Sequence, residues 1–160
     1  MRLFIAIPLP ETAKEKLVEL QRKLTGQLKI VEKKNLHMTM RFIGDCDPQE
    51  WIQKMESIGE KPFTMVFDKI GVFPGVGRPR VVWAGCEPSE SLLNIHRVIG
   101  EGELSPHVTL ARVKGTPDKS VLELLNEEIS VEVRVDRILL MNSSLGPSGP
   151  NYEVVHEKTL

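Results

Sequence analysis

The sequence has few cysteines, few aromatic residues and no long hydrophobic run, and each shortage excludes a class of protein. Its two cysteines, Cys46 and Cys86, lie 40 residues apart and outside any C-x-x-C spacing, so we expect reduced core thiols rather than a disulfide or a metal pair. Only 5% of the residues are aromatic, which argues against an extended surface on which nucleic-acid bases stack. No apolar stretch approaches the ~20 residues that span a bilayer. The apolar start of the chain ends at Leu9 and predicts a first strand rather than a signal peptide.

The charge of the chain is nearly balanced but unevenly distributed. A net charge of −1 argues against a protein that coats nucleic acid, because such binding depends on many Lys and Arg side chains. Residues 1–80 nevertheless hold 14 basic and 10 acidic side chains, whereas residues 81–160 hold 7 and 12. This asymmetry suits a protein that binds a few phosphates. For Lys33 and Lys34, a solvated charged surface is an equally good explanation.

The sequence lacks the common motifs that indicate a bound cofactor or metal. The chain contains no Walker motif, no dinucleotide-binding glycine pattern and no H-E-x-x-H or C-x-x-C spacing. We therefore expect neither a metal nor a cofactor. With 160 residues, of which 41% are hydrophobic, the chain is long enough for one globular domain. We expect a cytoplasmic monomer with no membrane partner.

Two of the four histidines stand in the same pattern, His-x-Thr-x, as HMTM at His37–Met40 and HVTL at His107–Leu110. Apolar residues fill every x position, so each copy predicts a half-buried strand. Side chains alternate across a strand, so the histidine and threonine of each copy share one face, together with Arg41 in the first copy. The residues expected to face the core are Met38, Met40 and Phe42 in the first copy and Val108 and Leu110 in the second.

The elements around the two motifs also repeat. RLFIAIPLPE (Arg2–Glu11) and RVVWAGCEPS (Arg80–Ser89) predict matching strands, with Ala6 aligned to Ala84 and Pro10 to Pro88. The predicted helices are Glu11–Leu24 and Ser89–Ile99 before the motifs, and Pro48–Ile58 and Pro117–Asn126 after them. The predicted third strands contain Phe67–Ile70 and Val135–Ile138. The predicted hairpin turns are Pro74–Pro79 and Gly146–Pro150, and a closing strand contains Tyr152–His156.

This repeat predicts an α+β fold with two pseudo-symmetric lobes, each a mainly antiparallel sheet with helices on its outer face, around a central cleft. We expect a single domain, 1–160, with an internal duplication at approximately 2–75 and 80–145 and a closing strand at 151–158. One spacing differs, because Ala6 to His37 spans 31 residues whereas Ala84 to His107 spans only 23. The second copy is therefore short around Gly100–Leu104.

A cleft lined by two histidines and two threonines can perform acid–base chemistry on a phosphate. Imidazole has an ordinary pKa near 6.5, so one ring can accept a proton while the other donates one near neutral pH. Threonine hydroxyls can donate hydrogen bonds to the non-bridging oxygens of a phosphate. A 2′,3′-cyclic phosphate at an RNA end suits such a site, because its strained ring holds the leaving oxygen in place.

NLHMTMRFIGD and SPHVTLAR resemble the motifs of the two-histidine phosphoesterases, in particular RNA 2′,3′-cyclic phosphodiesterases, also called 2′-5′ RNA ligases. RLFIAIPLP, RPRVVWAG and GPNYEVV are similar to the same subfamily. The resemblance implies that His37 donates a proton to the 3′ oxygen and that His107 accepts one from water, giving a 2′-phosphate. With a 5′-hydroxyl in place of water, the product would be a 2′-5′ linkage. The chain is shorter than the family pattern before His107 and around Asn126–Val131.

Four further residues are candidates for substrate binding: Arg41, Arg80, Arg112 and Tyr152. In a regular strand Arg112 faces away from His107, so it reaches the cleft only if the strand bulges or ends there. A surface salt bridge is the alternative for Arg41, and packing is the alternative to base stacking for Tyr152. We expect His96 and His156 to be structural.

The predicted function is metal-independent hydrolysis of RNA 2′,3′-cyclic phosphate ends by His37, His107, Thr39 and Thr109. The predicted partners are RNA ends or nucleotides that carry this group. Two alternatives remain open: 2′-5′ ligation or cleavage by the same residues, and a nucleotide- or RNA-binding module without turnover.

Overall fold

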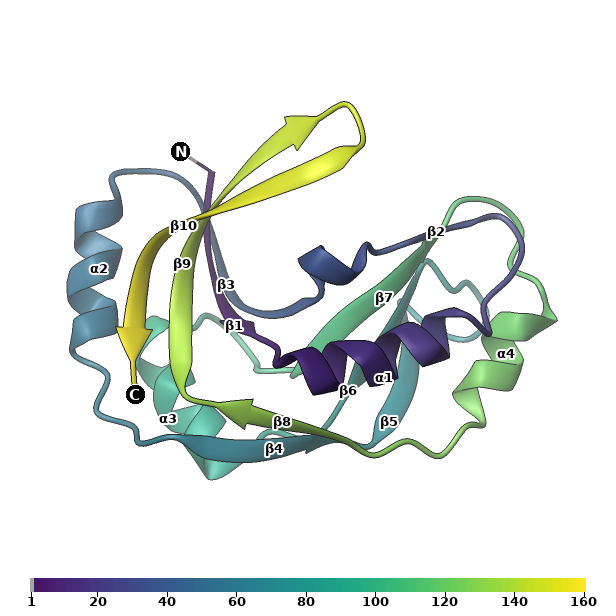
Figure 1. The fold of residues 1–160 in the computed structure, drawn as a ribbon, viewed down its shortest axis with the longest axis horizontal. Helices are drawn as coiled ribbons and strands as arrows, with labels where there is room; N and C mark the ends of the chain where they lie inside the picture. Colours follow the sequence, from purple (N-terminus) through teal and green to yellow (C-terminus); the bar gives the residue numbers. More distant parts are fainter. Residues whose placement is uncertain (1) are drawn as a thin grey trace.

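Most elements of the computed structural model, which describes residues 2–160, lie close to their predicted positions (Figure 1). The first half contains β1 (Arg2–Pro8), α1 (Glu11–Gln21), β2 (Leu28–Ile30), the 3-10 turn η1 (Lys33–Asn35), β3 (His37–Asp45), α2 (Pro48–Glu56), β4 (Phe63–Phe67) and β5 (Lys69–Phe73). The second half contains β6 (Val81–Gly85), α3 (Glu90–Ile99), β7 (His107–Val113), α4 (Lys119–Leu125), β8 (Val131–Val135), β9 (Arg137–Gly146) and β10 (Gly149–Thr159).

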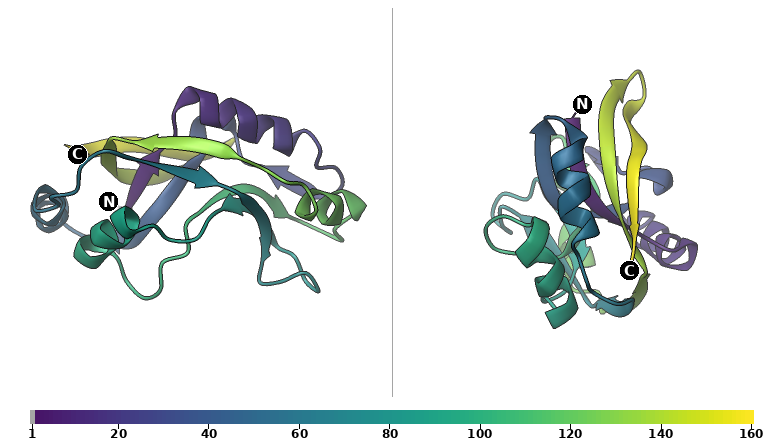
Figure 2. Two further views of the ribbon diagram at one scale, coloured as in Figure 1. Left: turned by 90° about the horizontal axis from the view of Figure 1, so that it is seen from below. Right: turned by 90° about the vertical axis from the view of Figure 1, so that its left-hand side faces the viewer.

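Polar side chains fix where three of the helices begin. Asp47, Ser89 and Asp118 accept hydrogen bonds from backbone N–H groups in the first turns of α2, α3 and α4. The cap at Asp118 explains why α4 begins at Lys119 rather than at the predicted Pro117. α2 and α3 pack against each other at one end of the molecule, and α4 lies at the opposite end beside β5 (Figures 1 and 2).

Every strand pair among the described residues is antiparallel, and eight of the strands form one sheet. Its order is β10-β9-β1-β3-β7-β6-β5, and β2 pairs with β7 on the edge that also meets β3. β4 and β8 form a separate two-stranded sheet. β3 and β7 meet through a single register pair, Met38 with Val108, so the large sheet divides there into two lobes. The fold is therefore α+β and antiparallel, which confirms the predicted class.

Each lobe contains strands from both halves of the chain. β5 of the first half pairs with β6, and β9 of the second half pairs with β1. The sequence repeat implied that each lobe comes from one half, and this assignment is wrong. The short turn after Phe73 makes β5 and β6 hairpin partners, so β5 joins the second lobe. We propose that the repeated order of elements reflects a duplication within one domain.

Each predicted third strand is in fact two strands. The chain leaves β4 at Phe67 and enters β5 at Lys69, and between them the N–H of Asp68 donates to the carbonyl of Gly85 at 3.0 Å. Asp136 separates β8 from β9 in the same way. One half of each predicted strand therefore belongs to the small sheet and the other half to the large sheet.

β2 and η1 lie between α1 and β3, and no such elements lie between α3 and β7. This insertion accounts for the longer spacing in the first copy. The register also corrects the alignment of the two copies. Ala6 pairs with Thr39, and Trp83 pairs with Thr109, so Ala6 corresponds to Trp83 rather than to Ala84.

β3 has a bulge at the last motif position, Met40. β1 pairs Ala6 with Thr39 but Ile5 with Arg41, which leaves Met40 as an extra residue. An extra residue reverses the alternation of side chains beyond it. Arg41 and Phe42 therefore face the opposite way from the prediction for a regular strand, and a second register shift follows between Phe42 and Gly44.

The cysteines and the helices complete the comparison with the sequence. Cys86 is buried, but Cys46 is exposed just beyond β3, so the prediction of two core thiols is wrong for Cys46. No helix within residues 2–160 is long and apolar enough to cross a membrane.

Candidate active site

The two His-x-Thr-x motifs meet where β3 and β7 touch. Met38 and Val108 form the register pair and are fully buried, so the motif side chains on either side of them face away from the core. An antiparallel register centred on this pair places each histidine across from the threonine of the other motif. The four side chains brought together are His37, Thr39, His107 and Thr109.

Backbone carbonyls hold both imidazole rings in the same way. Nδ1 of His37 lies 2.6 Å from the carbonyl oxygen of Asn35, and Nδ1 of His107 lies 2.7 Å from that of Ser105. Because a carbonyl oxygen can only accept, each Nδ1 carries a proton and donates it. Nε2 is therefore the atom of each ring that is free to exchange a proton. In His37 this atom lies 3.0 Å from the Thr39 hydroxyl.

The environment of His37 favours its neutral form. Burial lowers the pKa of His37 below its ordinary value of 6.5, and the charges of Lys14 and His107 lower it further. The hydrogen bond to the carbonyl of Asn35 acts in the opposite direction. The charge of His107 is therefore close enough to His37 to disfavour its protonated form. A negatively charged ligand between them would raise the pKa of His37 again.

Aromatic side chains enclose both histidines. The rings of Phe4 and Tyr152 each lie 5.3 Å from that of His37, between centroids. Phe73 lies 5.1 Å from His107. Trp83 forms the other wall of His107, at 6.1 Å. These rings pack against the imidazoles on both sides of the cleft and help to keep them in place.

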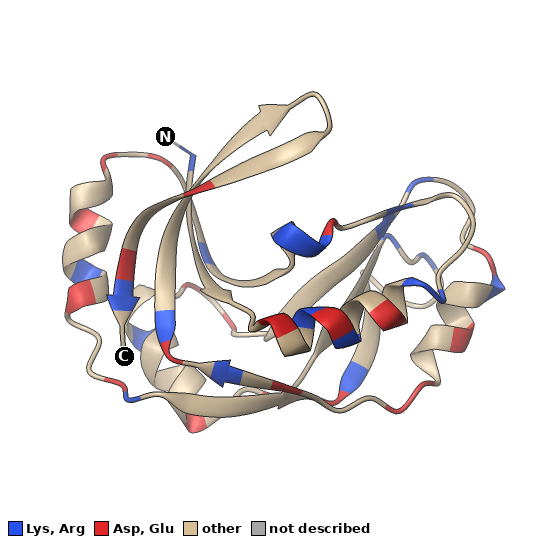
Figure 3. Ribbon diagram, in the orientation of Figure 1, with Lys and Arg blue, Asp and Glu red and all other residues tan. Residues whose placement is uncertain are grey.

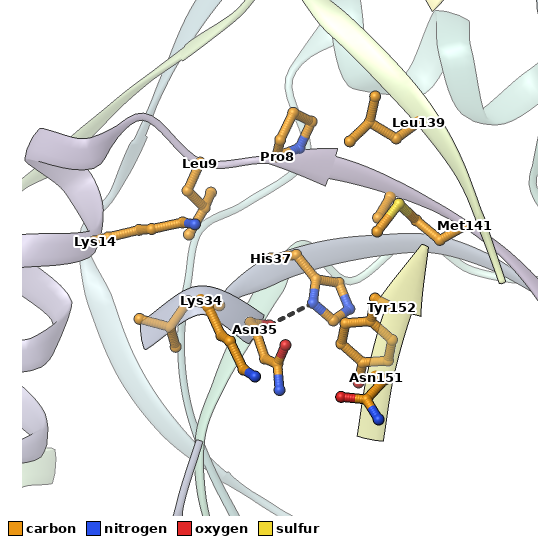
Figure 4. Close-up of a pocket in the computed structure, with 12 residues that line it drawn as sticks. Pro8, Leu9, Lys14, Lys34, Asn35, His37, Leu139, Met141, Asn151 and Tyr152 are labelled. Carbon is orange, nitrogen blue, oxygen red and sulfur yellow. Dashed lines mark hydrogen bonds between the residues drawn. The ribbon is translucent and has the colours of Figure 1, made fainter. Parts of the chain in front are cut away.

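A cavity of about 330 Å³ opens beside His37 (Figure 4). This volume lies within the range of small-molecule sites. Its apolar lining comes mainly from β1, the chain that follows it, and β9, and includes Ala6, Pro8, Leu9, Leu139 and Met141. The polar groups around it are Lys14, Lys34, Asn35, Asn151 and Tyr152. The cavity can therefore accept a flat apolar group whose edges carry hydrogen-bonding atoms.

Arg112 lies on the same face as His107 because β7 also has a bulge. The register with β6 passes from Ala111 directly to Thr109, so Leu110 is the extra residue. The positive charge of Arg112 acts to lower the pKa of Tyr152, against the larger effect of burial, which raises it. Arg112 is therefore close to the ring that contacts His37. The bulge supplies the condition under which the sequence predicted that Arg112 reaches the cleft.

A buried glutamine of α1 holds this bulge. Nε2 of Gln21, a residue only 4% exposed, donates to the carbonyl oxygens of Leu110 and Val31, each at 2.9 Å. The N–H of Val31 donates to the same Leu110 carbonyl at 3.0 Å. α1 thus stabilises the part of β7 that turns Arg112 into the cleft.

Arg41 points away from the cleft, contrary to the prediction. The bulge in β3 turns it toward the helices, where it donates to the carbonyl of Gly100 at 3.0 Å and pairs with Glu101 at 3.2 Å. Its guanidinium also lies over the ring of Trp51. The same bulge moves Phe42 out of its predicted core position, and its side chain is 77% exposed.

The other candidates lie outside the cavity beside His37. Arg80 lines a separate groove. Nε2 of His156 lies 2.7 Å from a carboxylate oxygen of Glu56, and His96 contacts a backbone carbonyl after α3. These contacts agree with structural roles for both histidines.

Sequence reasoning missed several groups that shape the site. Asn35 and Ser105 act through their carbonyls, and their signal was positional, because each stands two residues before a motif histidine. Lys14 and Gln21 come from a helix that is distant in sequence. Nothing in the sequence pattern assigns them to the cleft.

The fold and the paired motifs together define a class of phosphoesterase. A family model described as LigT-like phosphoesterase matches residues 7–83. The chain is also 34% identical, over 174 aligned positions that cover 98% of it, to a relative of matching length. It therefore belongs to the LigT-like phosphoesterase family.

That relative is the RNA 2′,3′-cyclic phosphodiesterase of Methanocaldococcus jannaschii, of which the match covers 99%. The protein of the same name from Thermotoga maritima is also 34% identical, with 98% of this chain and 94% of the relative covered. Among solved structures, a Thermus thermophilus protein matches with a TM-score of 0.82 and 30% identity, covering 100% of this chain and 98% of that one. Escherichia coli LigT complexed with 3′-AMP shares the fold, with a TM-score of 0.81, 22% identity and coverage of 99% and 97%.

Proposed function

We propose that this protein hydrolyses the 2′,3′-cyclic phosphate at RNA ends, or on nucleotides that carry the same group, to a 2′-phosphate. The observation that carries the proposal is the pair His37 and His107, each with Nδ1 bound to a carbonyl and Nε2 free to move a proton. Relatives that match almost the whole chain and are named RNA 2′,3′-cyclic phosphodiesterase support it.

In the proposed reaction, Nε2 of His107 accepts a proton from a water molecule as the water oxygen attacks phosphorus. The bond between phosphorus and the 3′ oxygen breaks, and Nε2 of His37 donates a proton to that oxygen. The products are a 2′-phosphate and a free 3′-hydroxyl. General acid and general base catalysis are each typically worth ~10²–10⁴ in rate.

Because the pKa of His37 is lowered, its role as the general acid depends on the bound substrate. In the free protein, burial favours the neutral ring, which has no proton to donate from Nε2. A bound cyclic phosphate is an anion and favours the protonated ring. His37 is thus expected to acquire its proton when substrate binds, with Thr39 accepting a hydrogen bond from Nε2 until the 3′ oxygen takes its place.

Three kinds of side chain are proposed to bind the substrate. The hydroxyls of Thr39 and Thr109 donate to non-bridging phosphate oxygens, and Arg112 neutralises the charge that develops there. The cavity beside His37 receives the terminal nucleoside, with Tyr152 beside its base. This assignment follows from the acid role of His37, which requires the sugar to lie on its side of the cleft.

The test is turnover of a 2′,3′-cyclic mononucleotide in EDTA by the intact protein and by His37→Ala and His107→Ala. Loss of either proton-transfer group is expected to lower kcat by about a hundredfold or more. His156→Ala is the matched control, because its imidazole pairs with Glu56 outside the cleft. It is expected to keep full activity.

Three outcomes would contradict this proposal. Activity lost in EDTA and restored by metal would refute the metal-independent mechanism. Full activity in either motif variant would refute the paired histidines. Nucleotide binding without turnover of any cyclic phosphate substrate would favour a binding module.

A second candidate activity is 2′-5′ joining or cleavage by the same residues. A 5′-hydroxyl in place of water at His107 gives a 2′-5′ linkage without any change in the roles of the two histidines. Joining would be seen as a longer product when a 5′-hydroxyl RNA is added to the same assay.

We further propose that the protein acts as a monomer in the cytoplasm. Its two cysteines are free, one exposed and one buried, which fits a reducing compartment. A mass measurement in solution tests the oligomeric state.

A further inference from the structure

A second groove, of about 440 Å³, lies at the far end of β7 from His107. Three cationic side chains line it, Arg78, Arg80 and Lys114, and no acidic residue is part of its lining. We call these three residues and the groove that they line the distal basic groove. Figure 3 shows basic residues on β2, at the end of β7 and in the adjoining loops.

Backbone hydrogen bonds fix the loops that form this groove. The N–H of Val113 donates to the carbonyl of Arg80, and that of Lys114 to the carbonyl of Gln27, both at 2.8 Å. The side-chain oxygen of Gln27 accepts from the N–H of Thr116 at 3.2 Å. The chain segments next to β6, β7 and β2 are thus joined at one place, which holds Arg80 and Lys114 near each other.

The charges of the distal basic groove are not neutralised within the protein. No carboxylate within residues 2–160 lies within ion-pair distance of Arg78, Arg80 or Lys114, whereas Lys23 and Lys69 pair with glutamates at 2.8 and 2.5 Å. The nearby carboxylate of Asp118 accepts hydrogen bonds from Thr25 and Ser120 instead. An anion can therefore bind the groove without first displacing an internal ion pair.

The groove lies on the same strand as the active site but far from its chemistry. β7 runs from His107 to Val113, and with Leu110 as the extra residue this length is about five regular steps of 3.3 Å, or roughly 17 Å. Arg112 lies between the two ends, and Lys29 of β2 pairs with it in register. Basic residues therefore continue from the cleft toward the groove, and a phosphate in the groove cannot be the one that reacts at His107.

We propose that the distal basic groove binds backbone phosphates of the RNA chain that precedes the cyclic phosphate, several nucleotides from the reacting end. This inference rests on the proposed function, in which water is the nucleophile and the substrate's own chain is the only source of further phosphates. Arginine and lysine bind phosphate oxygens without reading sequence. The groove thus gives preference for RNA over mononucleotides, but no preference among sequences.

The experiment compares Arg78→Ala/Lys114→Ala with a matched double variant, Lys61→Ala/Arg134→Ala. Each pair removes one lysine and one arginine that are exposed and make no ion pair with a described residue. Two substrates are used, a 2′,3′-cyclic mononucleotide and an RNA of about eight nucleotides that ends in the same nucleotide, a length typical of single-strand sites. kcat and KM are measured for both substrates over a range of salt concentrations.

For the intact protein, KM for the RNA is expected to be lower than KM for the mononucleotide and to rise with salt. Three phosphate contacts on a single strand predict a slope of about 2 in log KM against log salt, and removal of two contacts lowers it by about 1.4. The groove variant is expected to raise KM for the RNA about tenfold at low salt and to leave mononucleotide turnover unchanged. The matched variant is expected to behave like the intact protein.

The two proposals fail separately in this experiment. Absence of mononucleotide and RNA turnover by the intact protein would refute the proposed function. If the intact protein turns over the mononucleotide normally but has the same KM for both substrates, the proposed role of the groove is refuted and the proposed function stands. The same conclusion would follow if the groove variant and the matched variant gave the same KM for the RNA.

Discussion

Replacing Gln21 by methionine should destabilise the protein and weaken substrate binding together, because one buried amide holds the bulge that positions Arg112. The substitution keeps a side chain of similar length but removes both hydrogen bonds, to Leu110 and to Val31. The Leu110 carbonyl keeps its bond from the N–H of Val31. The carbonyl of Val31 loses its bond from Gln21.

The expected cost can be estimated from these contacts. A typical internal hydrogen bond contributes about 0.5–1.5 kcal/mol, and a buried polar group left without a partner costs about 1–3 kcal/mol. For Gln21→Met we therefore expect the free energy of unfolding to fall by about 2 kcal/mol. For a chain of this size, such a loss lowers the Tm by roughly 4–8 °C.

Urea unfolding and thermal unfolding measure this change, with Glu19→Met as the control on the same helix. Glu19 is exposed, so its substitution is expected to change stability by no more than about 0.5 kcal/mol. At a temperature where both variants are folded, Gln21→Met should also raise KM for a cyclic nucleotide, because Arg112 is less firmly held. Equal stability of the two variants would refute the role of Gln21, and a normal KM in a destabilised Gln21→Met would refute its link to Arg112.

Three other predictions follow from single residues. The pKa of His37 is lowered on folding, so the unfolded chain binds more protons at this residue than the folded chain does. The free energy of unfolding should therefore decline as the pH falls from about 6.5 through the lowered pKa. In urea titrations, His37→Gln should flatten this dependence on pH. Gly71→Ala would place a Cβ 2.1 Å from the indole of Trp83 and is expected to cost about 1–3 kcal/mol in thermal unfolding; an unchanged Tm would contradict this packing. Burial raises the pKa of the Cys86 thiol to about 11, so iodoacetamide should modify Cys46 and spare Cys86 in the native protein, and equal labelling by mass spectrometry would count against the structure.

The parts of the fold that could be predicted are those governed by local pattern. Apolar alternation located the two motif strands, and helical spacing located the helices within a few residues. The hairpin turn predicted at Pro74–Pro79 does join β5 to β6, so this part of the strand exchange could be predicted. The pairing of β9 with β1 could not, because no local pattern indicates which edge a strand from the other end of the chain pairs with.

In the candidate site too, local pattern predicts some features and not others. The two histidines and their threonines share a face because the alternation holds as far as Thr39 and Thr109. Directly after them, at Met40 and Leu110, each strand has an extra residue, which a sequence pattern does not reveal. That single residue reverses the outcome for two arginines, since it removes Arg41 from the cleft and brings Arg112 into it.

The exchange of strands between lobes has a consequence for how the chain folds as it is synthesised. β1 emerges before the other described strands, yet one of its edges pairs with β9, so that Arg2 meets Ser143. Pairings between such distant segments slow folding, because much chain entropy is lost before the contact forms. A nascent chain of about half the length has β1 without β9 and β5 without β6, and both edges stay open for wrong partners. We therefore expect that neither half of the chain folds alone. In refolding of the intact protein, we expect the pairing of β9 with β1 to limit the rate.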